Sequence, residues 1–431
     1  MVDVQRSCNK RMISVVAVIF LVNIALYAVR YVSISPQDGG TSENKQVYEK
    51  NREIGAVFAA RQHHLRDVCL MKGHIPPLTV AESTFKGGTV VEIRHNILYC
   101  PVQKVGSSFW RKTLTAMSRQ GRLNSPFQVE PSKNNKLELY QNFRKSSNGT
   151  TYQKDLFMTT ATSLIVVRDP YTKLFSAYVD KLYHPNYLFW KITGKQIAKM
   201  TKNKNSIVCG NDISFSSFIK YIISKTKGGG RKLNRHFTPI YKHCHPCKTK
   251  YDFIMKFENF KEDLYYIIDN WNARFNLNIS FRDFERQAAI NIASKHINIS
   301  FSTIKMFSKI CNISVHNFLL RTWRFLQISG LLPKEIDMPF PNNESSSRIT
   351  KEMYFNVIKD VLSRDIDWAR VKKQRQEALV QAYQRINRTD MEKLRKIVRP
   401  DCQYFDYDES PDYLFEKSSV KFNYFDGISM S

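Results

Sequence analysis

Two segments of the chain each combine a short apolar run, a polar loop and a helix-like stretch. The first passes from the apolar run Ile97-Leu98-Tyr99, through a loop with one lysine, one glycine and two serines, into a helix expected to begin near Trp110. The second passes from the apolar run 164–167 to Arg168, and a helix is expected over 171–183. Strands that alternate with helices favour a parallel sheet covered by helices. We therefore predict an α/β fold with a central parallel sheet flanked by helices.

Both loops carry residue types suited to anion binding. Backbone N–H groups at a helix start bind phosphate, while Lys104 supplies a mobile charge and Ser107 and Ser108 supply hydroxyls. Arg168 is a fork-shaped donor suited to a second phosphate, and Ser176 follows it about two helical turns later. Each loop alone also fits an ordinary basic turn or an ion-paired helix start, because a complete P-loop pattern is absent. Together, they predict a ligand with two phosphate groups.

The order of these motifs resembles that of the Golgi carbohydrate sulfotransferases, which include the chondroitin and dermatan 4-O-sulfotransferases and the glucuronyl 3-O-sulfotransferase. Similar segments run in family order from about residue 88 to about residue 260, with a weaker one near the C-terminus. Beyond the two loops, they are 211–218, 234–239, Cys244-His245-Pro246-Cys247, 251–258 and 404–407.

The resemblance implies a P-loop-like sulfotransferase fold and a carbohydrate O-sulfotransferase that uses 3′-phosphoadenosine 5′-phosphosulfate (PAPS) as sulfate donor. It implies that the first loop binds the 5′-phosphosulfate, and that Arg168 and Ser176 bind the 3′-phosphate. No metal ion is expected. The residues assigned to the nucleotide are Lys104, Val105, Gly106, Ser107, Ser108, Phe109, Trp110, Arg168 and Ser176.

Two positions depart from the family pattern. Gln103 stands where the family has proline, and Phe109 stands where it has asparagine. Loss of the proline frees the backbone at that position, so the loop is expected to be less preorganised. These departures support an alternative hypothesis, a non-catalytic, membrane-anchored glycan-binding protein that retains the fold. The intact Lys104, Arg168 and Ser176 favour the enzyme.

Sulfuryl transfer depends on positioning and on stabilising negative charge that spreads in the transition state. We assign to Lys104 the role of stabilising the negative charge on the leaving phosphate. The acceptor hydroxyl needs a general base, a role that suits histidine near neutral pH. His236, in the segment that resembles an Asn-x-His-Trp-x-Pro block, is the first candidate, and His95 is the second. A structural histidine that caps a turn before Pro239 would give the same pattern.

The N-terminal region predicts delivery to the secretory lumen. Residues 12–29 form an apolar run long enough to span a bilayer, and three cations precede it, which places the N-terminus in the cytoplasm. A cleaved signal peptide is the alternative. We predict a single-pass type II protein of the Golgi membrane. Its parts are a cytoplasmic tail (1–11), a transmembrane signal anchor (12–32), a stem (33–82) and a lumenal sulfotransferase domain (83–431).

Sequons and cysteines agree with a lumenal location. Seven cysteines follow the anchor, an odd number that leaves one thiol free or intermolecular, and structural disulfides of open connectivity are favoured over a zinc site or a redox Cys-x-x-Cys. Six Asn-x-Ser/Thr sequons predict glycosylation at Asn148, Asn278, Asn298, Asn312, Asn343 and Asn387.

The net charge of +28, from 66 basic and 38 acidic residues, indicates polyanionic partners. A lumenal location excludes nucleic acid, and leaves the nucleotide and an acidic glycan or proteoglycan; the resemblance points to the 4-hydroxyl of N-acetylgalactosamine in chondroitin or dermatan. The sequence does not decide between a monomer and a homodimer. The polar stretch 276–347 is expected to be a variable insertion, and residues 352–370 and 371–388 are expected to form a pair of packing helices.

Overall fold

A computed structural model of the chain separates into two compact units, residues 1–56 and residues 57–431. The predicted cytoplasmic tail and transmembrane anchor lie outside the described residues. Among the helices that the structure does describe, none is long and apolar enough to cross a membrane. The described residues are 42–75, 89–119, 122–130, 157, 159–202, 208–227, 233–311, 313–342, 346, 348–416 and 422–425.

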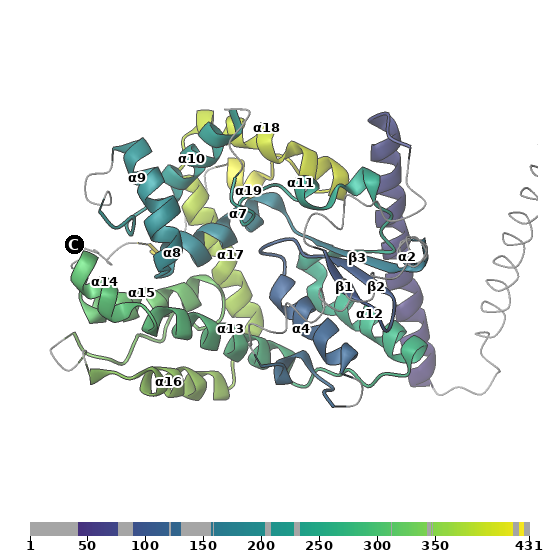
Figure 1. Ribbon diagram of the computed structural model, residues 1–431, viewed down its shortest axis with the longest axis horizontal. Helices are drawn as coiled ribbons and strands as arrows, with labels where there is room; N and C mark the ends of the chain where they lie inside the picture. The colour runs from purple at the N-terminus through teal and green to yellow at the C-terminus, as the bar shows by residue number, and fades with distance from the viewer. Residues whose placement is uncertain are drawn as a thin grey trace, which may run out of the picture. The chain divides into compact units, whose positions relative to one another are not determined.

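A four-stranded sheet lies toward one side of the larger unit (Figure 1), with the strands in the order β1-β2-β3-β4. β2 and β3 are parallel, as are β3 and β4, whereas β1 pairs with β2 in the antiparallel sense. The α/β prediction is thus confirmed for a mostly parallel sheet flanked by helices. β1 is antiparallel because only a short turn joins it to β2, too short for a crossover. The strands are β1 (Val90–Glu92), β2 (Ile97–Cys100), β3 (Thr162–Val167) and β4 (Phe253–Lys256).

A helix follows each of the three parallel strands (Figure 1). α4 (Ser107–Ser118) follows β2, α7 (Pro170–Tyr178) follows β3, and α12 (Phe260–Phe275) follows β4 after the short helix η6 (Phe257–Asn259). α7 starts where it does because the Asp169 side chain accepts a hydrogen bond from the backbone N–H of Thr172, and proline occupies the first helical position. The chain then continues as a π-helical turn, η2 (Val179–Tyr183).

A layer of further helices shares one large apolar core with α7. The stretch 276–347, expected to be an insertion, contributes α13 and α15, and α13 packs against α15 and α16 (Figure 1). Two helices are present where the pair was expected, α16 and α17, but they pack on other elements: α16 on α13, and α17 on α15 and α10. These elements are α8 (Tyr187–Phe189), η3 (Trp190–Gly194), α9 (Lys195–Thr201), α10 (Phe215–Lys227), α11 (Tyr241–Cys244), α13 (Phe284–Phe301), α14 (Ile304–Cys311), α15 (Val315–Ile328), α16 (Lys351–Ser363), α17 (Trp368–Gln384), α18 (Arg388–Phe405) and α19 (Asp412–Phe415).

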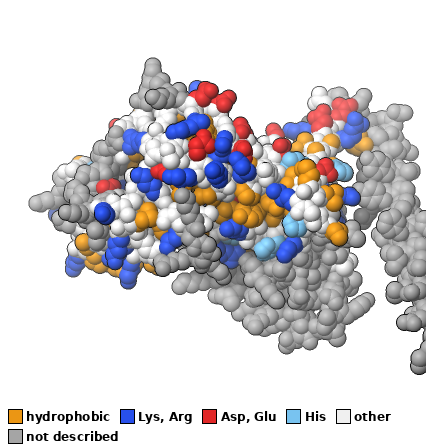
Figure 2. Space-filling view, turned by 90° about the horizontal axis from the view of Figure 1, so that it is seen from above, with side chains coloured by type: hydrophobic (Ala, Val, Ile, Leu, Met, Phe, Trp, Pro, Cys, Tyr) orange, Lys and Arg blue, Asp and Glu red, His pale blue; other side chains and the backbone are white. Residues whose placement is uncertain are grey.

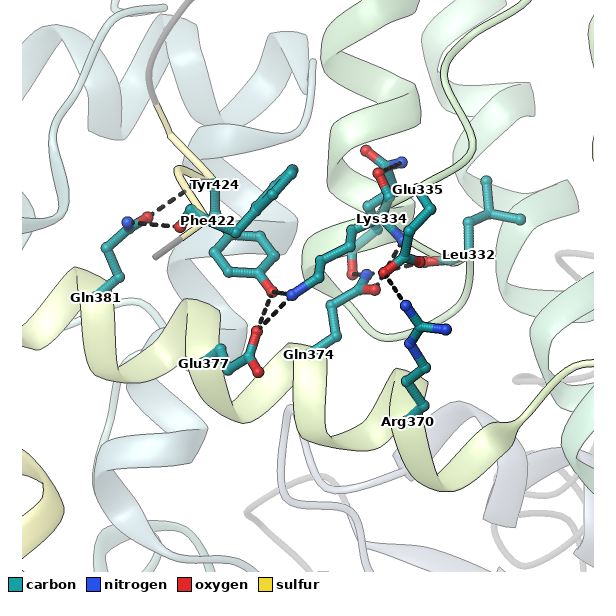
Figure 3. Close-up of polar contacts among 10 residues, drawn as sticks. Leu332, Lys334, Glu335, Arg370, Gln374, Glu377, Gln381, Phe422 and Tyr424 are labelled. Atoms are coloured by element: carbon teal, nitrogen blue, oxygen red, sulfur yellow. Dashed lines mark hydrogen bonds and ion pairs between the residues drawn. The ribbon is translucent and has the colours of Figure 1, made fainter. Parts of the chain in front are cut away.

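The C-terminal segment 422–425 lies against α17 (Figure 3). The Gln381 side chain pairs with its backbone, donating to the Phe422 carbonyl at 2.9 Å and accepting from the Tyr424 N–H at 2.9 Å. The Tyr424 hydroxyl donates to Glu377 at 2.7 Å. Phe425 then packs 5.7 Å from Tyr183, so this segment contacts the π-helical turn.

The second half of helix α2 (Ser42–Met71) belongs to the larger unit. Phe58 packs against Phe253 of β4, and the Arg61 guanidinium forms an ion pair of 2.6 Å with Asp263 of α12. The sequence analysis predicted that residues 33–82, which include all of this helix, form a stem. In the structure, residues 57–71 cover β4 and α12.

Three disulfides join distant parts of the chain, and they confirm the prediction of structural bonds. Of the seven cysteines, Cys402 is left unpaired and buried. The two cysteines of Cys244-His245-Pro246-Cys247 bond to different partners, so they form neither a zinc pair nor a redox dithiol. The disulfides are Cys69–Cys247, Cys100–Cys244 and Cys209–Cys311.

Three of the six predicted glycosylation sites lie within the described residues. Asn278, Asn298 and Asn387 are exposed. Asn387 also caps α18, because its side-chain oxygen accepts a hydrogen bond of 2.9 Å from the Asp390 backbone N–H. The remaining three, Asn148, Asn312 and Asn343, lie outside the described residues.

Candidate functional site

The loop between β2 and α4 turns sharply through two residues with positive φ, Lys104 (72°) and Gly106 (84°). Gly106 ends the loop, and α4 begins at Ser107, three residues earlier than the sequence predicted. No side chain caps this helix start, so its first N–H groups are open to an anion. A Cβ atom on Gly106 would lie 2.9 Å from the Phe260 ring, which means that only glycine fits here.

The side chains of Phe109 and Trp110 turn away from the loop. Phe109 packs in an aromatic cluster, with ring centroids 5.4–5.8 Å away, formed by Phe127, Phe260, Phe281 and Phe284. Trp110 is fully buried against Tyr99 and Trp271. Of the residues assigned to the nucleotide, these two therefore anchor α4, and the loop and the helix start are left for a ligand.

Arg168 lies at the end of β3, directly beside this loop. Its Nη1 donates a hydrogen bond of 2.9 Å to the Lys104 carbonyl, and its guanidinium stacks 4.5 Å from the Phe257 ring. The side chain is 2% exposed, and burial lowers its pKa to about 10. Its Nε–H has no partner within the described residues, an arrangement that is costly unless a ligand accepts that hydrogen bond. The side chain of Ser176, half-buried on α7, makes no hydrogen bond within the described residues either.

The Lys104 side chain points to a carboxylate that the sequence analysis did not identify. Its Nζ lies 2.6 Å from Oδ2 of Asp180, on the π-helical turn η2. The same carboxylate pairs with Lys181 at 3.3 Å and with Nε2 of His296 at 3.0 Å. Burial lowers the pKa of Lys104 to about 8, against the opposing effect of Asp180. The surrounding cations hold the pKa of Asp180 well below its usual value, although burial opposes them.

His236 lies close to this cluster. Oδ1 of Asn234 accepts hydrogen bonds from both the backbone N–H of His236 (3.0 Å) and its Nδ1 (2.7 Å). Because the backbone N–H can only donate, the Asn234 atom is the oxygen, Nδ1 carries the proton, and Nε2 keeps a free lone pair. Burial, followed by the charges of Lys181 and Lys104, lowers the pKa of His236 to about 3. The imidazole is therefore neutral and able to accept a proton.

The segment that carries His236 is fixed by buried charges on two helices. Nζ of Lys173, on α7, donates to the Thr238 carbonyl at 2.7 Å. Asp401, on α18, accepts hydrogen bonds from the backbone N–H groups of Ile240 (2.7 Å) and Tyr241 (2.9 Å) at the start of α11. The disulfide from Cys100 to Cys244 then ties α11 to the end of β2.

The second candidate base, His95, lies elsewhere. It occupies the turn between β1 and β2, at the opposite end of β2 from Lys104, and its Nδ1 lies 2.8 Å from Glu92. Residues that the sequence analysis missed are Asp180, Lys181, Lys295 and His296. Asp180 could have been noticed, because it follows Ser176 by one helical turn and so falls on the same face. Nothing in the sequence links Lys295 and His296 to the loop.

Positive charge gathers around this site. Burial lowers the pKa of His236 most, and the charges of Lys181, Lys104 and Lys295 lower it further against the effect of Asp180. The face of the molecule shown in Figure 2 carries basic side chains next to apolar and acidic ones. A site with this potential attracts and orients anions.

Comparisons with known proteins match this region. The sequence profile of the Sulfotransferase family matches residues 88–324, more than half of the chain. Carbohydrate sulfotransferase 9 of Homo sapiens is 30% identical over 181 residues, which are 41% of this chain and 39% of that protein. Carbohydrate sulfotransferase 11 of Mus musculus is 25% identical over 244 residues, 53% of this chain and 68% of that protein.

Carbohydrate sulfotransferase 8 of Homo sapiens is 28% identical over 206 residues, 46% of each chain. The chain thus spans less than half the length of two of these three relatives. No solved structure gives a significant match.

Proposed function

The chain belongs to the sulfotransferase family, and from this premise we propose that it transfers the sulfuryl group of PAPS to a hydroxyl of a glycan. The observation that carries the proposal is the pair of anion-binding features at the ends of β2 and β3. One is the uncapped start of α4 behind Gly106, and the other is the buried Arg168 with its unpartnered Nε–H. A donor with a 5′-phosphosulfate and a 3′-phosphate needs two such features.

The described residues fit this donor. Lys104 and the N–H groups at the start of α4 would hold the phosphosulfate, and Arg168 with Ser176 would hold the 3′-phosphate. The donor supplies a sulfur atom whose bond to the phosphate oxygen breaks as its bond to the acceptor oxygen forms. Lys104 stabilises the charge left on the phosphate. The acceptor hydroxyl loses its proton to Nε2 of His236.

Donor binding also improves His236 as a base. Burial depresses the pKa of its imidazole most, the cations Lys181, Lys104 and Lys295 depress it further, and Asp180 offsets them only in part. A polyanionic nucleotide beside them counters this effect, because nearby negative charge favours the protonated form. The pKa of His236 then rises toward the range in which a general base works well.

We propose N-acetylgalactosamine of chondroitin or dermatan, at its 4-hydroxyl, as the acceptor. Its support is the positive charge around His236, from Lys181, Lys104 and Lys295, which suits a uronic-acid-containing chain. The three disulfides favour an oxidising compartment, and we propose a type II protein of the Golgi membrane whose catalytic part is lumenal.

Calorimetry with adenosine 3′,5′-bisphosphate (PAP) tests the donor site on the full-length protein. Binding should weaken at least about tenfold in both Lys104→Ala and Arg168→Ala, as expected for a lost charged hydrogen bond. Arg370→Ala is the matched control, because Arg370 is exposed and pairs only with Glu335 among the described residues. Absence of PAP binding by the folded wild type would favour the non-catalytic glycan-binding alternative.

Sulfate transfer tests the acceptor. With PAPS as donor, incorporation into chondroitin should exceed incorporation into a neutral oligosaccharide that ends in N-acetylgalactosamine. Equal incorporation would show that the cations near His236 do not select an acidic chain. PAP binding without transfer to either acceptor would retain the donor site and remove the proposed acceptor class.

A further inference from the structure

We propose that Asp180 is a positioning residue for sulfuryl transfer: its carboxylate holds the ammonium group of Lys104 at the donor site and competes with the bound donor for it. This inference rests on the proposed function, because it gives Lys104 its role toward the donor. It adds a residue and an exchange of partners to that function.

The geometry makes Asp180 the common acceptor of the site. Both lysines share its Oδ2, Lys104 at 2.6 Å and Lys181 at 3.3 Å, while His296 contacts Oδ1 at 3.0 Å. The residue is 6% exposed, so little solvent screens these contacts. The same ammonium group cannot make its full set of contacts both with this carboxylate and with an incoming phosphosulfate. Donor binding therefore shifts Lys104 from one anion toward the other.

The Lys104 backbone is fixed, so the carboxylate determines where its side chain points. Its left-handed backbone and the hydrogen bond from Arg168 Nη1 to its carbonyl hold the main chain in place. The flexible four-carbon side chain needs a partner to stay in one position. Asp180 supplies it.

The π-helical turn that carries Asp180 is held just as firmly. A wider turn leaves backbone carbonyls without their usual helical partners, and π-turns of this kind occur often at functional sites. Here the Trp190 indole N–H donates to the Leu182 carbonyl at 2.7 Å, and the Arg321 guanidinium donates to the carbonyls of Leu182 and Tyr183. Asp180 is thus placed by packing and by its neighbours' hydrogen bonds.

The carboxylate also keeps Lys104 charged. Burial favours the neutral amine, and the lysine retains its proton near neutral pH with the help of Asp180. The groups that act on Lys104 are Asp180 and Lys181 on η2 and Lys295 on α13, while His296 on α13 bonds Asp180 directly. His236 lies beside them, on the segment that precedes α11 in the chain.

Asp180→Asn provides the test, with PAP calorimetry and steady-state kinetics on the full-length protein. Measured at acidic pH, where Lys104 keeps its proton in the variant as well, removal of a negative charge beside the donor should tighten PAP binding about three- to tenfold. It should also lower kcat at least about tenfold and move the alkaline limb of the kcat/KM profile to lower pH. Opposite changes in affinity and turnover distinguish positioning from damage, since a disrupted site would lose both. Weaker PAP binding, or an unchanged kcat, would overturn the proposal.

Asp180→Glu separates charge from position and serves if the Asn variant does not fold. The longer side chain keeps the charge and displaces it, so kcat should fall without tighter PAP binding; wild-type turnover would refute the role. Asp263→Asn is the control, because that buried carboxylate pairs with Arg61 instead. It should change stability without opposing changes in affinity and kcat. If the wild type fails to bind PAP, the donor site itself is refuted, which no Asp180 result can imitate.

Discussion

Gly106→Ala should be among the most damaging single substitutions in the loop. An L-residue at φ 84° costs about 1–2 kcal/mol. The new Cβ would also lie 2.9 Å from Cε2 of Phe260, inside the cluster around Phe109, and such overpacking costs about 1–3 kcal/mol more. We therefore expect a loss of about 2–5 kcal/mol in the free energy of unfolding, measured by urea denaturation, and PAP binding weakened about tenfold or more.

Gly73 offers a matched control, because its φ is 75° and a Cβ there would have nothing within 4 Å. Gly73→Ala should cost only the backbone term, about 1–2 kcal/mol, and leave PAP binding unchanged. Phe260→Leu should reduce the additional cost of Gly106→Ala in a double-mutant cycle, since it removes the ring that the methyl group meets. Equal destabilisation by the two glycine substitutions would refute the steric argument, as would a cycle without coupling.

Three further predictions concern other parts of the site. Replacement of Cys100 and Cys244 by serine opens a disulfide that lies inside the intact Cys69–Cys247 bond, so the loop it closes is only about 34 residues long and the chain-entropy relation gives about 4 kcal/mol. An unchanged thermal midpoint would show that the bond does not stabilise the fold. PAP affinity should fall as pH rises through about 8, where Lys104 loses its proton. Calorimetry from pH 7 to about 1.5 units above that pKa should show this fall in the wild type and not in Lys104→Arg, because arginine stays charged. His236→Ala should lower kcat by a factor of about 10²–10⁴ with PAP binding retained. Asn234→Ala should lower kcat less, because it removes the oxygen that keeps the imidazole proton on Nδ1. Wild-type kcat in either variant would remove the base assignment.

The sheet and the turn from β2 into α4 could be predicted because their signals are local. The apolar run before Pro101 and the run before Arg168 are each continuous, as expected for strands buried on both faces. The start of α4 was placed too late because the left-handed backbone of Gly106 is not visible in sequence. Once glycine makes that turn, helix geometry is available from the next residue.

The partners of Lys104 could not be predicted, because they depend on long-range packing. His296 lies in a polar stretch that looked like an insertion, and its helix is buried against α15 and α16 only through scattered apolar positions. The sequence shows Asp180 as one charge in an ordinary helical pattern. The π-helical turn that directs it toward Lys104 is stabilised by Arg321, from α15, which is distant in sequence.

The two departures from the family pattern have a common structural answer. A proline before Lys104 would restrict the loop, and Gln103 gives up that restriction. In place of the proline, the Arg168 guanidinium donates a hydrogen bond to the Lys104 carbonyl, and Phe109 fixes the first turn of α4 by packing in the aromatic cluster. Both devices act on the backbone on either side of Gly106, where the donor's phosphosulfate is expected. Rigidity is thus supplied by tertiary contacts, which argues that these substitutions preserve the proposed nucleotide site and favours the enzyme over the non-catalytic alternative.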